Sequence, residues 1–298
     1  MPIHLVIDGV SFQLREGHDF NWLNGWGRVF QVFDQQDSGN IGFGVERGGV
    51  RRFIKYAGAS TVDYPGSPAD AVDRLIKAVP VYRDLRHPAL VSLIDCFDTV
   101  NGFAMVFEWF NGECLHSHWL FSPREKYTHP ASPNFRFNRL PLTKRLAAFE
   151  RILSFHAHAE ARGYLAVDFY DGSILYDFET DQARICDIDF YQRRPLINTM
   201  GRMWGSTRFM APEEFELGAA IDQRTNVFTM GAMAFACFGG TLDRSLAKWT
   251  AGEALYQVAL QAVSSNRASR QATVAELRDA WEAARAIGCP ASGGPEPG

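Results

Sequence analysis

Four aspartates stand close together in a stretch that is otherwise rich in apolar residues. Segment 164–192 reads YLAVDFYDGSILYDFETDQARICDIDFYQ, in which Asp168, Asp171, Asp187 and Asp189 are interspersed with Val, Ile, Leu, Phe and Tyr. An ionised carboxylate among apolar groups costs several kcal/mol unless a cation or hydrogen-bond donors compensate it. The four aspartates therefore predict a positive charge nearby.

Lys55 is a second candidate for chemistry, because it follows apolar residues on a predicted strand. In RRFIKYAG its ammonium would project to one face of the strand with Phe53, while Ile54 takes the other face. A lysine in such a position can also be a solvated surface side chain. The order of the motifs around it favours a role in chemistry. Along the chain come GWGRV, FIK, a predicted helix, LRHPALVSLIDCF, VFEWFNGE, the aspartate segment and GSTRFMAPEE.

The composition is that of an ordinary globular protein. The chain has 298 residues, 46% hydrophobic and 21% charged, which suffices for about two domains or lobes. Its net charge of -4 argues against binding to nucleic acid or an anionic membrane. The longest apolar run, from Val227, is too short to span a bilayer, and the start does not resemble a signal peptide. Five cysteines without a CxxC pair are typical of reduced core residues in a cytoplasmic protein.

The elements that must position these residues change in character near residue 110. Before it, short and partly alternating apolar runs predict strands of an antiparallel sheet, namely VIDGVSFQL, WGRVFQVFDQ, NIGFGVERGG, VRRFIKYAG and GFAMVFEWF. One helix over 67–79 interrupts them, with Ser67 as N-cap and Pro68 in its first turn. We expect Pro80 to end or kink this helix.

Helical periodicity dominates the rest of the chain. Four segments predict helices: LTKRLAAFERILSFHAHAEARG, the run around Val227, GEALYQVALQAV and TVAELRDAWEAARA. Residues 116–139 predict an irregular insertion, and the Pro- and Gly-rich residues 286–298 predict a flexible tail. We therefore expect an α+β protein with a β-rich part over residues 1–111 and a mainly helical part over residues 112–285.

Taken in order, the motifs resemble the protein kinase superfamily from about residue 20 to residue 285. RHPALVSLIDCF is similar to HPNIVxLxDxF, GYLAVDFYDGSIL to GIxHRDLKxxNIL, ICDIDF to the DFG region and GSTRFMAPEE to GTxxYMAPE. TNVFTMGAMAF and NRASRQATVAEL resemble a buried helix and a late arginine segment of the family. The resemblance implies a protein-kinase-like fold of two lobes, a β-rich N-lobe and a mainly helical C-lobe, with ATP between them.

The resemblance also implies roles for single residues. Lys55 would clamp the α and β phosphates of ATP. Asp187 would hold Mg²⁺ or Mn²⁺, and Asp168 would accept or orient the proton of a substrate hydroxyl. Tyr170 stands where the family has a catalytic lysine, and Ser173 where it has a metal-binding asparagine. A divalent metal would then compensate the clustered aspartates.

The resemblance further implies contacts to the nucleotide. Phe107 would lie behind the adenine, and the backbone of Glu108 and Phe110 would hydrogen-bond to its edge. Glu113 would reach the ribose hydroxyls or remain a solvated carboxylate. Four residues of the glycine turn would surround the phosphates, namely Gly25, Trp26, Gly27 and Val29.

Several positions depart from the family pattern around the glycine turn and Lys55. Trp22 and Asn24 stand in place of two loop glycines, which weakens a phosphate cradle built from backbone N–H groups. The helix position that holds a glutamate partner for the lysine is Ala78. Asp70 or Asp73 would substitute for that glutamate only in a shifted helix.

Other departures concern the aspartate segment. Ala166 and Val167 replace the histidine and arginine of HRD, so a phosphorylated activation loop would lack that arginine clamp. Asp171 and Asp189 are extra carboxylates near the expected metal. Asp189 would either flank a cation together with Asp187 or pair with one of the arginines Arg193, Arg194 and Arg202. By contrast, Glu213 and Arg270 match a buried ion pair of structural importance.

Three functions remain open on the sequence alone. The first is an atypical serine/threonine protein kinase that transfers the γ-phosphate of ATP to a hydroxyl, with Mg²⁺ or Mn²⁺ as cofactor. The second is a small-molecule phosphotransferase similar to aminoglycoside and choline kinases, although these lack a segment like APEE. The third is a pseudokinase that binds nucleotide or a partner without transfer. The substrate, Thr199, Ser206 and Thr207 as phosphosites, and the oligomeric state stay open.

Overall fold

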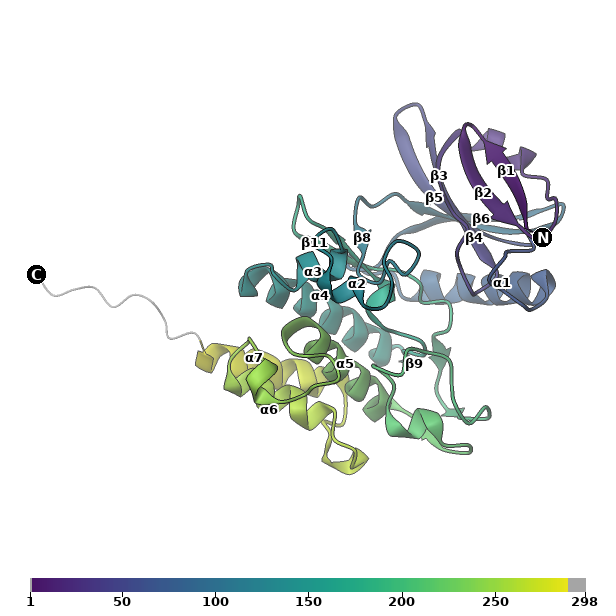
Figure 1. Cartoon of the computed structure of the whole chain (residues 1–298). Helices are drawn as coiled ribbons and strands as arrows, with labels where there is room; N and C mark the ends of the chain where they lie inside the picture. The colour runs from purple at the N-terminus through teal and green to yellow at the C-terminus, as the bar shows by residue number, and fades with distance from the viewer. Residues whose placement is uncertain (1, 289–298) are drawn as a thin grey trace, which may run out of the picture. The chain divides into compact units, whose positions relative to one another are not determined.

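The chain folds into two compact units, which we describe separately. The computed structural model describes residues 2–288 (Figure 1). The first unit contains the residues up to Asn111 together with Cys186–Asp189, and the second contains Gly112–Ile185 and the residues from Phe190 on. The expected α+β class is confirmed, because one unit is built on a sheet and the other mainly on helices. The short segment Cys186–Asp189 packs with the first unit, whereas the sequence analysis placed it with the helical part.

The first unit is built on a five-stranded antiparallel sheet. Its strand order is β3-β4-β5-β7-β6, and each neighbouring pair of strands is antiparallel. A separate two-stranded hairpin precedes the sheet in the chain. The hairpin is β1 (Ile3–Ile7) and β2 (Val10–Leu14), and the sheet is β3 (Arg28–Phe33), β4 (Asn40–Arg47), β5 (Val50–Ala57), β6 (Leu93–Thr99) and β7 (Gly102–Glu108). Four of the predicted strands are confirmed as β3, β4, β5 and β7, whereas the predicted run VIDGVSFQL contains the turn between β1 and β2 and lies in the separate hairpin; β6 is an additional strand that the sequence analysis did not name.

The two faces of this sheet have different roles. Ile54 and Tyr56 of β5 point into a fully buried core, which also contains Val29 and residues of β2. Because side chains alternate along a strand, Lys55 points to the opposite face, where it stands between Gly42 of β4 and Met105 of β7. The sheet thus has a core face and a Lys55 face.

Helix α1 (Pro68–Asp84) packs against β5 and β7 on the Lys55 face. Its start is as predicted, since Ser67 Oγ accepts the N–H of Ala69 at 3.2 Å. The prediction that Pro80 ends the helix is wrong, because the helix continues to Asp84. Pro80 has no N–H, so the carbonyl of Ile76 four residues earlier lacks its helical hydrogen-bond donor. Both residues lie on the exposed side of the helix, where water can replace the missing hydrogen bond.

The second unit is dominated by four long helices. They are α4 (Leu142–Ala161), α5 (Gln223–Phe238), α6 (Glu253–Ala262) and α7 (Val274–Gly288). Helix α5 is buried on all sides from Thr225 to Phe238 and packs against α4, α6 and α7. Fully buried Trp281 of α7 fills the centre, with ring-centroid distances of 4.7 Å to Phe149 and 5.7 Å to Phe238. Within residues 2–288 no helix has the length and apolarity needed to cross a membrane.

Short elements complete the second unit. The strands are β8 (Glu113–Cys114), β9 (Tyr164–Leu165), β10 (Ile174–Asp177), β11 (Gln182–Ile185), β12 (Gln192–Arg193), β13 (Leu196–Ile197) and β14 (Ala220–Ile221). Segment 116–139, predicted to be irregular, contains two short helices, α2 (Glu125–Thr128) and α3 (Pro133–Phe137). The predicted tail over 286–298 starts too early, because α7 reaches Gly288; its remaining residues lie outside the described part of the chain.

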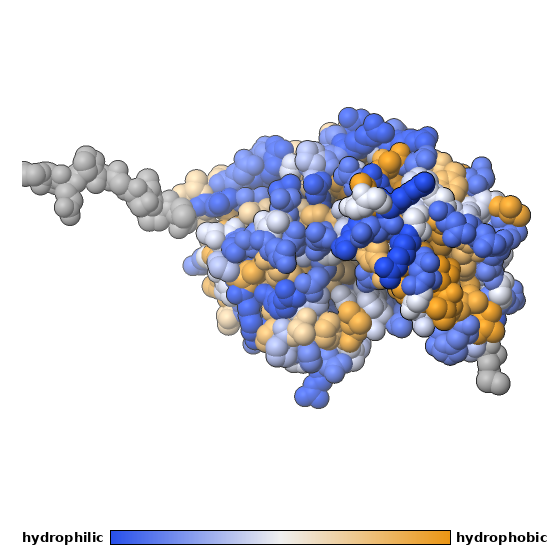
Figure 2. Space-filling model, turned by 90° about the horizontal axis from the view of Figure 1, so that it is seen from above, coloured by the Kyte–Doolittle hydropathy of each residue, from blue (hydrophilic) through white to orange (hydrophobic). Residues whose placement is uncertain are grey.

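The surface and the cysteines fit an ordinary globular protein. On the face shown in Figure 2, hydrophilic side chains cover most of the surface and apolar ones form separate patches. Within residues 2–288, Cys96, Cys114, Cys186 and Cys237 form no disulfide, and only Cys237 is buried in the core. Cys289 lies beyond the residues that the structure describes.

Candidate functional site

Lys55 and two aspartates form an ion cluster within the first unit. The Nζ atom of Lys55 lies 2.6 Å from Asp187 Oδ1 and 2.6 Å from Asp189 Oδ2. Burial opposes the charge of this lysine, but the two carboxylates outweigh burial and raise the pKa of Lys55 above its usual value. The lysine is therefore a fixed ammonium, and the positive charge predicted near these aspartates is present.

The two aspartates of this cluster differ in exposure. The side chain of Asp187 is 48% exposed, whereas that of Asp189 is 7% exposed. Asp187 also has a left-handed backbone conformation with a φ of 54°, which Asp tolerates better than most residues. Mg²⁺ is commonly bound by one or two carboxylates together with substrate phosphates, so the donor set at Asp187 fits such an ion.

The carboxylate of Asp189 is less available than that of Asp187 for binding a metal ion. Its Oδ1 accepts a hydrogen bond from the Tyr82 hydroxyl at 3.1 Å, and its Oδ2 accepts from Lys55. The prediction that it pairs with an arginine is wrong, because its partners are a lysine and a tyrosine. The structure also does not support its assignment to a metal, since burial and these two donors already occupy the carboxylate.

Helix α1 presents no acid to Lys55. Ala78 is fully buried at the position where the resemblance leads one to expect a glutamate. Tyr82 lies one helical turn further on, and so on the same face of the helix. The predicted substitutes Asp70 and Asp73 are both exposed to solvent. The residue that faces the cluster from α1 is therefore Tyr82, which the sequence analysis missed.

The predicted glycine turn lies on the wrong side of the sheet for Lys55. Residues Asn21–Gly25 form a 3-10 helix, and Trp26 stacks on Phe97 with centroids 5.5 Å apart. Val29 is fully buried in the core face. Trp26 and Val29 thus pack on the core face, and these contacts do not support the predicted role of Gly25, Trp26, Gly27 and Val29 at the nucleotide phosphates. The spacing of the glycines was correct for a turn but could not indicate which face the following strand buries.

The structure nevertheless explains why residue 27 is a glycine. Its φ is 124°, and a Cβ there would come within 2.3 Å of the Glu46 carbonyl oxygen of β4. A side chain would therefore push β3 away from β4. This glycine serves strand packing.

Aromatic rings cover the Lys55 face next to the lysine. A Cβ on Gly42 would lie 2.8 Å from the Phe53 ring, and one on Gly44 would lie 2.8 Å from the Phe30 ring. Phe30 in turn meets Trp109, with centroids 4.9 Å apart. The alternating glycines of NIGFGVE are the sequence signal for this close approach, and the sequence analysis did not use it.

The residues predicted to contact adenine and ribose have partners of their own. Phe107 is buried and packs on Tyr82, with centroids 5.0 Å apart. The N–H of Glu108 donates to the Ser92 carbonyl at 3.0 Å, so its own carbonyl is the group that could face a base edge. In the second unit, one nitrogen of Arg136 donates to both oxygens of Glu113 at 2.7 and 2.8 Å. Glu113 is thus an exposed carboxylate held in a surface ion pair with Arg136.

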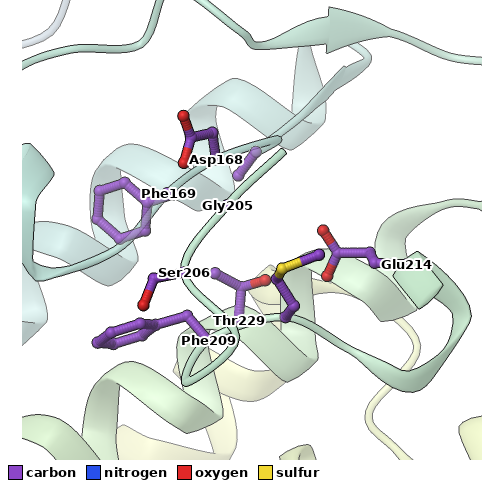
Figure 3. A pocket seen from close by; sticks show the side chains of 9 residues that line it. Asp168, Phe169, Gly205, Ser206, Phe209, Glu214 and Thr229 are labelled. Atoms are coloured by element: carbon purple, nitrogen blue, oxygen red, sulfur yellow. The ribbon is translucent and has the colours of Figure 1, made fainter. Parts of the chain in front are cut away.

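In the second unit, Asp168 lines a small hollow that side chains nearly fill (Figure 3). Asp168 has a φ of 61°, again in the left-handed region. Ser206, Thr229 and Glu214 line the same hollow. Burial raises the pKa of Glu214 to about 8, and the neighbouring Glu213 and Asp168 add to this shift. Glu214 is a second carboxyl group near Asp168 that the sequence analysis did not identify as part of the site.

Asp171 is compensated by basic side chains. Its carboxylate is buried and accepts from Lys126 and from two nitrogens of Arg208, at 3.0 and 2.8 Å. His116 lies 3.9 Å from the same carboxylate, and burial together with Lys126 lowers the pKa of His116 to about 4. The expectation that Asp171 lies near a metal is therefore replaced by a cluster of basic residues.

The neighbours of Asp171 have different surroundings. The Tyr170 ring packs against His116, with centroids 5.6 Å apart. Ser173 is fully buried, and within the described residues its Oγ has no hydrogen-bond partner, so this oxygen could accept a ligand. The part of the chain that the structure describes contains no group of three or more His, Cys, Asp or Glu side chains able to hold a metal ion. A metal at Asp187 would thus need further oxygen ligands from water or phosphate.

Two other predictions concern the segment before α5. Glu213 and Arg270 form the expected buried ion pair, with two contacts of 2.7 and 3.0 Å. Val167, at the position of the HRD arginine, is buried in an apolar cluster with Met203 and Met210. This part of the second unit is held by apolar packing where the resembling family would use an arginine.

Comparison with known proteins finds only distant similarity, and the similar proteins are kinases. The chain is 22% identical over 216 residues to serine/threonine-protein kinase D2 of rat, mouse and human. Each match covers 72% of this chain and 23% of the relative, so the chain spans less than a quarter of these curated proteins. No protein-family model matches the chain. The chain is thus distantly similar to a serine/threonine kinase.

Proposed function

We propose that the chain is an ATP-dependent phosphotransferase with a protein-kinase-like fold of two lobes, acting on serine or threonine hydroxyls of a protein. The observation that carries this proposal is the ion pair between partly buried Lys55 and half-exposed Asp187. The ordered motifs and the distant similarity to a serine/threonine kinase support it. The proposal includes a cytoplasmic location, supported by the four cysteines within residues 2–288 that are not joined in disulfides.

Each residue of the proposed site has a separate task. Lys55 binds phosphate oxygens with its fixed ammonium, and Asp187 offers its exposed oxygen to Mg²⁺ or Mn²⁺. The divalent ion would supply charge neutralisation for the phosphates. Asp168 orients the hydroxyl and takes up its proton. Ser173 stays a predicted metal ligand, and among the described residues its buried Oγ has no hydrogen-bond partner.

Nucleotide binding without transfer is a second candidate. Tyr170 in place of a catalytic lysine supports it, because each well-placed charge at a reacting phosphoryl group is worth about 10² to 10³ in rate. The aromatic rings that cover the Lys55 face also leave less room for a base in the present arrangement. The APEE segment with its Glu213–Arg270 pair favours a protein substrate over a small alcohol.

The test has two stages. Thermal stability is first measured with ATP and either Mg²⁺ or Mn²⁺, and we expect a rise that is lost in Lys55→Ala and Asp187→Asn. Lys77→Ala, an exposed lysine of α1, serves as the control and should keep the rise. Transfer of labelled phosphate to protein then separates a kinase from a protein that only binds nucleotide. Absence of any shift with either metal would refute both candidates.

A further inference from the structure

We propose that Asp189 is the positioning residue that holds Lys55 for phosphate binding, in place of the helix glutamate that this chain lacks. The inference rests on the proposed function, which it deepens by assigning a role to the extra carboxylate. Ala78 supplies no acid at the helix position, and Asp189 Oδ2 lies 2.6 Å from the Lys55 ammonium. A single short segment thus carries both carboxylates that contact the lysine.

The difference in burial assigns separate tasks to the two carboxylates. Asp187, 48% exposed, can turn an oxygen toward a cation in solvent. Asp189, 7% exposed, has no such freedom and stays beside the lysine. When Asp187 is engaged by a metal, Asp189 is the carboxylate that keeps the ammonium in place.

Tyr82 fixes the direction of Asp189. Its hydroxyl donates to Asp189 Oδ1 at 3.1 Å and accepts the backbone N–H of Ile188 at 3.1 Å. Its ring is held against Phe107 of β7. Both oxygens of Asp189 therefore have a donor, and α1 contributes a neutral hydroxyl where a kinase-like helix would contribute a charge.

This arrangement links Lys55 to segment 186–189 directly. Lys55 Nζ is bound by Asp187 and Asp189, and Ile188 between them is bound by Tyr82. A movement of this segment would therefore displace the ammonium together with the proposed metal-binding carboxylate. The geometry predicts that the two groups are positioned as one unit.

The test uses the full chain and measures Lys55 without nucleotide. The rate of acetylation of Lys55 by acetic anhydride is followed at pH 8 to 10 by mass spectrometry, with exposed Lys77 as internal reference. Because the Asp189 carboxylate holds the Lys55 Nζ atom at 2.6 Å, we expect Asp189→Asn to free the side chain and raise Lys55 labelling about tenfold. Tyr82→Phe, which removes only the hydroxyl, should raise it about two- to threefold. Unchanged Lys55 labelling in both variants would overturn the proposal.

Kinetics then separate a positioning role from a merely structural one. If Asp189 positions the lysine, both variants should raise KM for ATP or lower kcat while the Lys77 reference stays unchanged. Because Tyr82→Phe removes a buried hydroxyl with two hydrogen bonds, it is assayed below its own unfolding temperature. Altered labelling with no change in either constant would overturn the positioning role. Labelling that changes as expected in a chain whose Lys55 is never protected by ATP would refute the proposed function and leave the Lys55–Asp189 link standing.

Discussion

Asp171 and Arg208 form a two-point ion pair in the second unit, although 37 residues separate them in the chain. Lys126 approaches the same buried carboxylate. Removing the charge of Asp171 would leave two basic side chains without their shared partner. We predict that Asp171→Asn lowers the free energy of unfolding by about 3 kcal/mol in urea denaturation.

The control for this prediction is an exposed pair. Arg278 and Asp279 lie on the surface of α7, and the Asp279 side chain is 66% exposed. Because solvent screens such pairs, Asp279→Asn should change the unfolding free energy by less than about 0.5 kcal/mol. Equal effects of the two substitutions would contradict the importance of the buried cluster.

Glu214 makes stability depend on pH. Its pKa is about 8 in the folded protein against an ordinary value of 4.5, so folding takes up a proton between these values. Stability therefore falls as pH rises through this window, by up to about 1.4 kcal/mol per pH unit. Glu214→Gln keeps an acceptor for the Ala211 N–H and should flatten the decline between pH 5 and 8. Parallel stability curves for the two proteins would show that Glu214 remains ionised when folded.

A substitution of Trp26 tests whether the predicted glycine turn packs on the core face of the sheet or contacts the nucleotide. Since its ring stacks on Phe97 at the core face, Trp26→Ala should lower the unfolding free energy by about 2 kcal/mol. It should leave the affinity for ATP, measured by calorimetry below the unfolding temperature, within about twofold. A large loss of affinity at unchanged stability would return Trp26 to the nucleotide site.

The burial of Val167 predicts that ATP binding and any transfer activity do not depend on phosphorylation of this chain. It is buried with Met203 and Met210, so the segment around Met203 is held without a phosphate and its arginine clamp. Treatment with a phosphatase should leave ATP binding and any transfer activity within about twofold, with mass spectrometry at Thr199, Ser206 and Thr207 confirming removal. A tenfold loss of activity after treatment would argue that a phosphorylated residue is required.

Local patterns in the sequence were sufficient to locate most of the strands and helices. Alternation of apolar residues located the strands around Lys55, and the Ser67-Pro68 start located α1. The same patterns showed that Lys55 and Ile54 point to opposite faces, because the side-chain period of a strand is fixed at two residues. The Glu213–Arg270 pair was also predictable, from the motifs that contain these residues.

Only the tertiary structure decided which groups meet. Lys55 is 134 residues from Asp189, and no local pattern indicates that this carboxylate would turn to the lysine rather than to an arginine or a metal. Likewise, periodicity could not tell which face of β3 is buried, and the structure places Val29 in the core rather than beside Lys55. The physical reason is that backbone geometry acts over a few residues, whereas the compensation of a buried charge depends on whatever donors packing brings within hydrogen-bond distance.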